Sequence, residues 1–287
     1  MGSKKLIQIL KSNHKHWVGD GFHVHTMFHP HMIEYHYTSP FIMMDYAPTQ
    51  FFPSTSAKRG VGEHPHRGFE TVTFALKGEI EHRDSSGGGG VIGTGDVQWM
   101  SAASGLVHDE FHSSEFAKTG GDFEMVQLWV NLPASEKMNP PKYQGIKDSD
   151  CPRVKLENGK AKIYAGEFEG VSGPGISYTP INLFEFNVQK DFGHKFELDE
   201  GSNTLILLLE GELNLGDKSF DDHSLAILSR AGTSFELKAK EDSRFIIFNG
   251  QPIDEPIVAH GPFVMNSKEE IIQAIEDFQN GKMGRLV

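Results

Sequence analysis

The alternation of apolar and polar residues predicts a chain built from short β-strands. Strand-like runs occur at residues 41–46, 69–76 and 97–100, where apolar side chains recur at every second position or form a short unbroken run. Tight turns follow at Lys77-Gly78-Glu79 and Gly93-Thr94-Gly95-Asp96, and residues of this kind commonly separate strands. The pattern therefore indicates an all-β protein.

Helical spacing appears near the C-terminus. Ser267 and Glu270 have the spacing of a capping box, and Gly281 provides a stop. Between them, apolar residues recur at helical intervals at Ile271, Ile272, Ala274, Ile275 and Phe278. We expect a short C-terminal helix with a core-facing stripe, preceded by a segment, residues 255–263, that crosses back over the first domain.

The chain divides into two halves of similar length. Pro140-Pro141 and the polar stretch up to Pro152 have the composition of a linker. The sequence Leu-Lys-Gly-Glu-Ile at residues 76–80 is echoed by Leu-Glu-Gly-Glu-Leu at residues 209–213, about half the chain away. Such an echo is typical of a duplicated barrel. We expect two tandem β-barrel domains, at residues 1–145 and 146–287.

Two short motifs in the first half have the composition of a metal centre. His64-Pro65-His66 and His108-Asp109-Glu110 each place two potential ligands on one face of a strand, because alternate side chains share a face. The H-x-H spacing alone is weak evidence, since three other pairs share it: His14/His16, His23/His25 and His29/His31. Those three pairs, with His36, lie among aromatic residues and prolines, and we interpret them as packing and surface residues.

The setting of the two motifs favours a metal site over ordinary histidines. The first opens a strand-like run and the second follows a turn and the apolar stretch 97–100. Three imidazoles and a carboxylate suit a divalent transition metal with open coordination positions. Iron(II) is the first choice, and nickel, manganese, cobalt and copper are alternatives.

Charge and cysteine content narrow the classes of function. The net charge is −12, from 39 acidic and 27 basic residues, which opposes direct nucleic-acid binding. The single cysteine, Cys151, excludes an internal disulfide. No apolar stretch approaches the length of about 20 residues that spans a membrane. We expect a soluble, cytoplasmic monomer.

Hydrolase and nucleotide-binding motifs are absent from the sequence. The glycine run at residues 87–90 is not followed by Gly-Lys-Ser/Thr, so we interpret it as a mobile hairpin tip. No G-x-S-x-G motif occurs. The chemistry suggested by the sequence is therefore that of the metal site.

Four segments are long and specific enough to indicate a family. They are HPHRGFETVTFALKGEIEHRDS (64–85), GTGDVQWMSAASGLVHDEFHS (93–113), QLWVNLPASEKMNPPKYQ (127–144) and EPIVAHGPFVMNS (255–267). In these segments the chain resembles the pirins, a branch of the cupin superfamily. The resemblance implies a bicupin with one mononuclear iron site in the N-terminal half, whose ligands fall on His64, His66, His108 and Glu110.

The broader cupin pattern offers a competing carboxylate at Glu70. Counting in steps of two from His66 places Glu70 on the same face, so we keep it as an alternative ligand or a supporting residue. The second half lacks the ligand motifs: His194 stands alone, and residues 226–233 contain no histidine. We expect the C-terminal barrel to bind no metal.

The resemblance also implies an activity. Several pirins oxidise the flavonol quercetin, cleaving its central ring with dioxygen and releasing carbon monoxide. In that hypothesis the metal binds an enolate oxygen of a small aromatic substrate, and Glu110 accepts the 3-hydroxyl proton. A different phenolic or enolisable substrate would use the same mechanism. The alternative is a metal-dependent, non-enzymatic regulator that binds transcription factors or metabolic enzymes. Other pirins resemble such regulators.

Two further expectations concern the surroundings of the metal. Protonation of ordinary histidines predicts metal loss as the pH falls toward about 6. Five apolar residues could line the substrate-binding site, although packing in the core is the simpler interpretation of each. They are Phe51, Phe52, Phe69, Trp99 and Met100.

Overall fold

Residues 2–286 are described by a computed structural model of the chain. β-Strands dominate it, and the described residues contain two α-helices, α1 (Ser114–Thr119) and α2 (Lys268–Gln279). The all-β prediction with a short C-terminal helix is confirmed. Three short 3₁₀ turns occur at Tyr35–Tyr37, Ala134–Glu136 and Asp148–Asp150.

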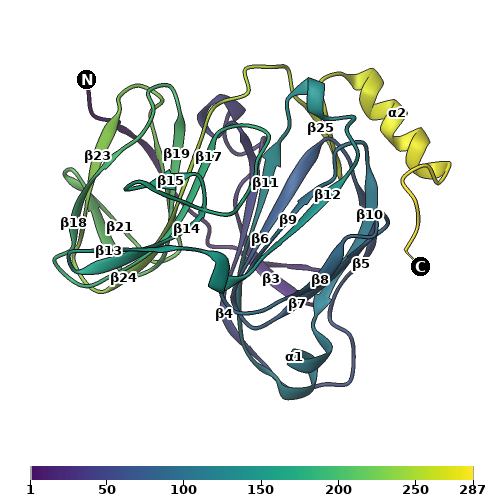
Figure 1. The fold of residues 1–287 in the computed structure, drawn as a ribbon, viewed down its shortest axis with the longest axis horizontal. Helices are drawn as coiled ribbons and strands as arrows, with labels where there is room; N and C mark the ends of the chain where they lie inside the picture. The colour runs from purple at the N-terminus through teal and green to yellow at the C-terminus, as the bar shows by residue number, and fades with distance from the viewer. Residues whose placement is uncertain (1, 287) are drawn as a thin grey trace. The chain divides into compact units, whose positions relative to one another are not determined.

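One barrel pairs a seven-stranded antiparallel sheet with a four-stranded one (Figure 1). The larger sheet has the order β12 (Lys142–Ile146), β9 (Val97–Ser101), β6 (Phe69–Lys77), β11 (Gly121–Asn131), β4 (Phe41–Phe52), β3 (Phe22–Phe28) and β2 (His16–Val18). The smaller sheet has the order β5 (Gly60–His66), β10 (Leu106–His112), β7 (Ile80–Asp84) and β8 (Gly89–Ile92).

The other barrel repeats this architecture with its own strands. Its larger sheet has the order β1 (Leu6–Lys11), β22 (Ser224–Leu228), β19 (Asn203–Glu210), β24 (Ser243–Gly250), β17 (Ile181–Val188), β14 (Gly159–Ala165) and β13 (Arg153–Leu156). Its smaller sheet has the order β18 (Gly193–Glu197), β23 (Ser234–Ala239), β20 (Glu212–Leu215) and β21 (Lys218–Asp221). Two short hairpins complete the chain: β15 (Glu167–Phe168) with β16 (Val171–Ser172), and β25 (Val258–His260) with β26 (Phe263–Met265).

The sequence echo marks an equivalent turn in the two barrels. Gly78 joins β6 to β7 and Gly211 joins β19 to β20, and each turn leads from the larger sheet to the smaller one. Both glycines have positive φ angles, +81° and +101°, which residues with a Cβ rarely adopt. The duplication predicted from the sequence is therefore also structural.

The two compact units are not continuous along the chain. One contains residues up to 13, 27–42 and 149–252, and the other contains 14–26, 43–148 and 253–286. One change of unit falls near residue 148, and each end of the chain belongs to the unit whose other residues are mostly distant from it in sequence. β1 pairs with β22, whereas β26 bridges to Arg67, because each terminal segment finds its hydrogen-bond partners in the barrel that is distant in sequence.

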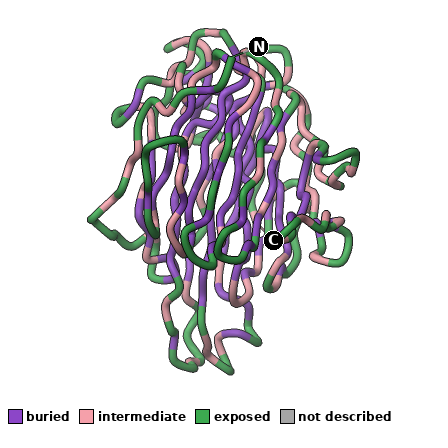
Figure 2. The backbone as a smooth tube through the Cα atoms, turned by 90° about the vertical axis from the view of Figure 1, so that its left-hand side faces the viewer, coloured by how far each residue is buried: buried purple, intermediate pink, exposed green. Residues whose placement is uncertain are grey.

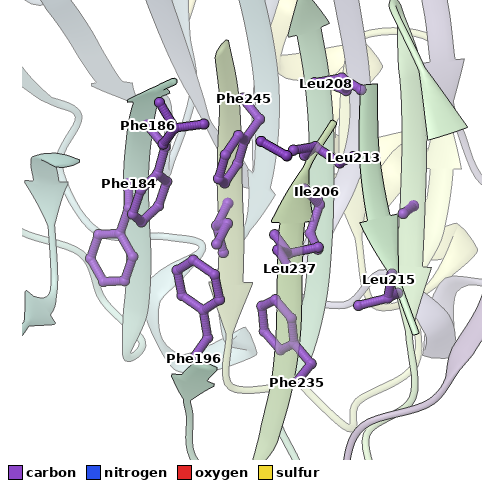
Figure 3. Close-up of a cluster of buried hydrophobic side chains, with 14 of the residues drawn as sticks. Phe184, Phe186, Phe196, Ile206, Leu208, Leu213, Leu215, Phe235, Leu237 and Phe245 are labelled. Carbon is purple, nitrogen blue, oxygen red and sulfur yellow. The ribbon is translucent and has the colours of Figure 1, made fainter. Parts of the chain in front are cut away.

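Buried residues concentrate in the strands, and exposed residues in the turns (Figure 2). In the barrel of residues 149–252 the core is rich in phenylalanine and leucine (Figure 3). Phe186 and Phe245 stack there with ring centroids 4.8 Å apart and an interplanar angle of 11°. Within residues 2–286, neither helix is long and apolar enough to cross a membrane.

The buried aromatic core predicts a large cost for removing Phe245. The residue is 0% exposed, so Phe245→Ala should lower the free energy of unfolding by about 3–5 kcal/mol through lost contacts and a cavity. Urea unfolding followed by circular dichroism measures this. Phe278→Ala is the control, since Phe278 is 40% exposed and its loss should cost less than about 1 kcal/mol. Equal effects would contradict the prediction.

Candidate metal centre

Strand pairing brings the two predicted ligand motifs together. β10 lies between β5 and β7 in the smaller sheet, and its register places His108 opposite His64 on β5. On the other side, Glu110 lies opposite His82 of β7. The motifs, distant in sequence, thus become neighbours across one antiparallel sheet.

Three of the four predicted ligands form one group. The side-chain donor atoms of His64, His66 and His108 all lie within 4.8 Å of one another. Their ring centroids are 4.9 Å apart for His64 and His66, 4.2 Å for His64 and His108, and 4.8 Å for His66 and His108. Glu110 belongs to a second group, with His82 and His108. His108 is therefore common to both.

The outer nitrogens of the first two rings are engaged by backbone carbonyls. His64 Nδ1 lies 2.8 Å from the carbonyl oxygen of Gly62, and His66 Nδ1 lies 3.4 Å from that of Pro262. Because a carbonyl oxygen only accepts hydrogen bonds, each Nδ1 donates and each Nε2 retains its lone pair. This tautomer leaves Nε2 of each ring able to bind a metal.

The environment of His108 fits a metal ion. Its Nε2 is buried and has no hydrogen-bond partner among the described residues, which is costly unless something else binds there. Burial, reinforced by the neighbouring histidines, holds the pKa of His108 well below the usual range. Burial and His64 do the same for the pKa of His66, against the effect of the Pro262 carbonyl. Neutral imidazoles with free lone pairs suit a divalent transition metal.

Glu110 is held from the opposite sheet. Gln98 on β9 donates through Nε2 to Glu110 Oε1, and Gln127 on β11 donates through Nε2 to Oε2 at 3.0 Å. Both amides also contact Thr73 Oγ1 on β6, at 3.3 and 3.5 Å. The two amide donors fix the orientation of the carboxylate.

Glu70 does not join the site. The chain turns at Gly68, with φ +88°, so that β5 and β6 belong to different sheets and counting in steps of two from His66 fails. On β6, Glu70 has the opposite parity to Thr73 and therefore points to the other face. Burial, partly offset by Trp99 and Ser101, raises the pKa of Glu70 to about 8, which favours the protonated acid, a poor ligand.

His82 is the residue that the sequence analysis missed. It lies on β7, is 0% exposed and shares the alternation of Ile80 and Asp84, so strand parity was the available signal. Burial alone would raise the pKa of Asp84, but hydrogen bonds from His82, Ser86 and Gly88 lower it to about 2. Tyr143 of β12 stacks on His82 with centroids 5.2 Å apart.

The site is partly open to solvent. His64, Gln127 and Trp129 are partly exposed, whereas His66, His108 and Glu110 are buried. Trp129 stacks on Phe69 with centroids 4.2 Å apart and contacts the His66 ring edge-on at 5.3 Å.

Only some of the five apolar residues that were expected beside the metal lie near the predicted ligands. Phe69 lies against His66, and Met100 has the inward parity of Gln98 on β9. Trp99 points away from the site with Glu70, Phe52 packs against His112 and Phe123, and Phe51 is an exposed residue of β4. Trp129 was not anticipated.

None of the other eleven histidines belongs to a potential metal group among residues 2–286. They are His14, His16, His23, His25, His29, His31, His36, His112, His194, His223 and His260. Cys151 is buried and forms no disulfide.

The C-terminal segment braces the strand that holds His66. Arg67 pairs with Asp277 of α2 at 2.9 Å and donates through Nε to the Ser104 carbonyl at 2.7 Å. Lys137 Nζ donates to the carbonyl oxygens of Gly68 and Val264, at 2.6 and 3.0 Å. Pro262, within the segment 255–263 that the sequence predicts to cross back, accepts a hydrogen bond from Arg67 N at 3.3 Å.

The chain is similar to known proteins over most of its length. The family model "Pirin" matches residues 21–130, and the model "Pirin C-terminal cupin domain" matches residues 183–284. A protein of Pseudomonas aeruginosa with the provisional name quercetin 2,3-dioxygenase is 46% identical over 284 residues, covering 98% of this chain and 99% of its own.

Solved structures share the same fold. A crystal structure of quercetin 2,3-dioxygenase from Acinetobacter baumannii has 47% identity and a TM-score of 0.96, covering 100% of both chains. A nickel(II) complex of the bacterial pirin YhhW from Escherichia coli has 18% identity and a TM-score of 0.64, and covers 86% of this chain and 99% of its own. At that identity the likeness shows the fold.

The Arg67–Asp277 pair predicts a measurable dependence of stability on α2. Asp277→Ala leaves the guanidinium, which is 5% exposed, without its carboxylate, and should lower the free energy of unfolding by about 3 kcal/mol. Chemical denaturation followed by tryptophan fluorescence measures this. Lys118→Ala removes a pair exposed on both sides and should cost less than about 1 kcal/mol. If Asp277→Ala were as stable as the wild type, the Arg67–Asp277 pair would not stabilise the protein.

Proposed function

Since the chain belongs to the pirin family of cupin proteins, we propose that it is a metal-dependent dioxygenase that cleaves a flavonol such as quercetin. The observation that carries this proposal is the convergence of three histidines on one point, with an unpartnered buried Nε2 on His108. The relatives named for quercetin 2,3-dioxygenase activity, at 46% and 47% identity over nearly the whole chain, support it.

In this proposal His64, His66, His108 and Glu110 hold one divalent transition metal ion, with iron(II) as the first choice. Such an ion supplies a Lewis-acidic, redox-active centre with open positions for substrate and dioxygen. Joining Glu110 to the three histidines requires its carboxylate to approach them, since its donor atoms group with His82 and His108. Metal analysis of the purified protein distinguishes iron from nickel, manganese, cobalt and copper.

The residues around the ion prepare the substrate. Glu110, oriented by Gln98 and Gln127, accepts the proton of the flavonol 3-hydroxyl at one carboxylate oxygen. The half-exposed ring of Trp129 offers an aromatic face beside His66. Its Nε1 is buried with no hydrogen-bond partner within residues 2–286, so its N–H is a donor that the protein itself does not use.

Glu110→Gln tests the role of the carboxylate. The amide retains an oxygen that binds metal but does not accept the substrate proton, so we expect partial metal content and a loss of turnover of at least about 100-fold. Oxygen uptake with quercetin, compared with metal-stripped wild type, measures it.

The matched control is Asp109→Asn, which changes the adjacent carboxylate, paired with Arg83, and should keep both metal and turnover. Full activity of Glu110→Gln would exclude the proton-acceptor role. No oxygen uptake by the iron-loaded wild type with quercetin would refute the proposed substrate.

The lowered pKa values of His66 and His108 shift the pH of metal loss. A lowered pKa keeps an imidazole neutral where a free one is protonated, so protons compete with the metal only below the ordinary range. We expect the metal to stay bound at pH 6, where ordinary histidines predicted its loss, and to leave at lower pH. Dialysis at pH 7, 6, 5 and 4 followed by metal analysis measures this; half-loss at pH 6 or above would contradict it.

A further inference from the structure

A line of hydrogen bonds leads from the metal centre into the wall of the barrel. His108 Nδ1 lies 3.2 Å from His82 Nδ1, and His82 Nε2 lies 3.2 Å from Asp84 Oδ2. The three side chains are buried. The line ends at Nε2 of His108, the atom that has no partner among the described residues.

The outer contact of His108 differs from those of His64 and His66. Their Nδ1 atoms face carbonyl oxygens, which only accept, and so their tautomers are determined. The Nδ1 of His108 faces another imidazole, which either donates or accepts. Something beyond His82 must therefore decide which nitrogen of His108 carries the proton.

Asp84 determines which atom donates in each of these hydrogen bonds. Its Oδ1 accepts from Ser86 N, Ser86 Oγ and Gly88 N, at 2.8, 2.6 and 3.0 Å, and its Oδ2 faces His82 Nε2. A carboxylate has no hydrogen to give, so His82 donates through Nε2. With one proton on each ring, His82 Nδ1 then accepts from His108 Nδ1. The Nε2 of His108 is left with its lone pair.

We propose that His82 and Asp84 are positioning residues that set the tautomer of His108 and hold its Nε2 lone pair toward His64 and His66. The inference rests on the proposed metal site and adds residues to it. Metal-binding histidines commonly donate their second N–H to a carboxylate. Here an additional imidazole is inserted between the ligand and the carboxylate.

The glycine-rich hairpin is part of this arrangement. A Cβ on Gly88 would lie 2.4 Å from Asp84 Oδ2 and 2.7 Å from Tyr143 Cβ, closer than any real contact. Tyr143 in turn stacks on His82. Asp84 and Tyr143 therefore leave no room for a side chain at residue 88. The sequence analysis predicted only a mobile hairpin tip here and did not anticipate this packing.

Asp84→Asn should exchange the donor and acceptor in each hydrogen bond of the line with little change in the shape of the side chain. The three donors keep an oxygen at the position of Oδ1, so the amide nitrogen takes the place of Oδ2 and donates to His82 Nε2. His82 then donates to His108 Nδ1, and the proton of His108 moves to Nε2. Nitrogen-15 NMR of histidine-labelled, metal-free full-length protein should show this tautomer change. The dissociation constant for nickel(II), used alone as the probe, should rise roughly 10–100-fold.

Two glycine variants provide an independent, matched comparison. Gly88→Ala displaces the Asp84 carboxylate without altering a polar group and should also weaken nickel(II) binding. Gly93→Ala makes the same substitution just after β8, where the new Cβ would lie an ordinary 3.9 Å from Glu79 Cγ. It should bind nickel(II) within about twofold of wild type. Circular dichroism verifies that each variant is folded.

Different results would contradict the positioning role of His82 and Asp84, here called the relay, and the proposed metal site. The relay would be overturned if His108 of the wild type were protonated at Nε2, or if Asp84→Asn left the tautomer unchanged. X-ray absorption of the nickel(II) form would also overturn it if His82→Gln lost a coordinated imidazole, because His82 would then be a ligand. The expected wild-type tautomer without nickel(II) binding would support the relay and contradict the proposed metal site.

Discussion

The antiparallel pairing of β5, β10 and β7 is the constraint on which the site depends. It places His64 opposite His108, and Glu110 opposite His82, so that side chains from three strands meet on one face. Between His108 and Glu110 the register with β5 shifts, and the carboxylate lies nearer to His82 than to His64. A change of one residue in this register would turn the ligands to the other face of the sheet.

The two sheets of this barrel have different roles. The smaller sheet supplies the imidazoles, and the larger one supplies the amides of Gln98 and Gln127 that hold Glu110. The C-terminal segment adds a third element, since the Pro262 carbonyl contacts His66 Nδ1 and Asp277 pairs with Arg67. The candidate metal site thus depends on residues from much of the chain.

The two barrels share an architecture but differ in the residues that they enclose. Both barrels pair seven strands with four and share the turn at Gly78 or Gly211. Only the barrel of residues 43–148 contains potential metal groups within the described chain. The barrel of residues 149–252 contains instead a core rich in phenylalanine and leucine. The same strand order therefore accommodates a candidate metal site in one barrel and an apolar core in the other, depending on the inward-facing residues.

The sequence by itself determined the all-β class, the C-terminal helix with its capping box, and the ligand pairs within single strands, because these depend on spacing along a few residues. Parity succeeded for His64 with His66 and failed for Glu70, since the turn at Gly68 moves the chain to the other sheet. Only the tertiary structure decided which carboxylate faces the histidines, which barrel receives each end of the chain, and that His82 and Asp84 adjoin His108. Those outcomes depend on hydrogen-bond register between strands that are distant in sequence, and local spacing carries no information about that register.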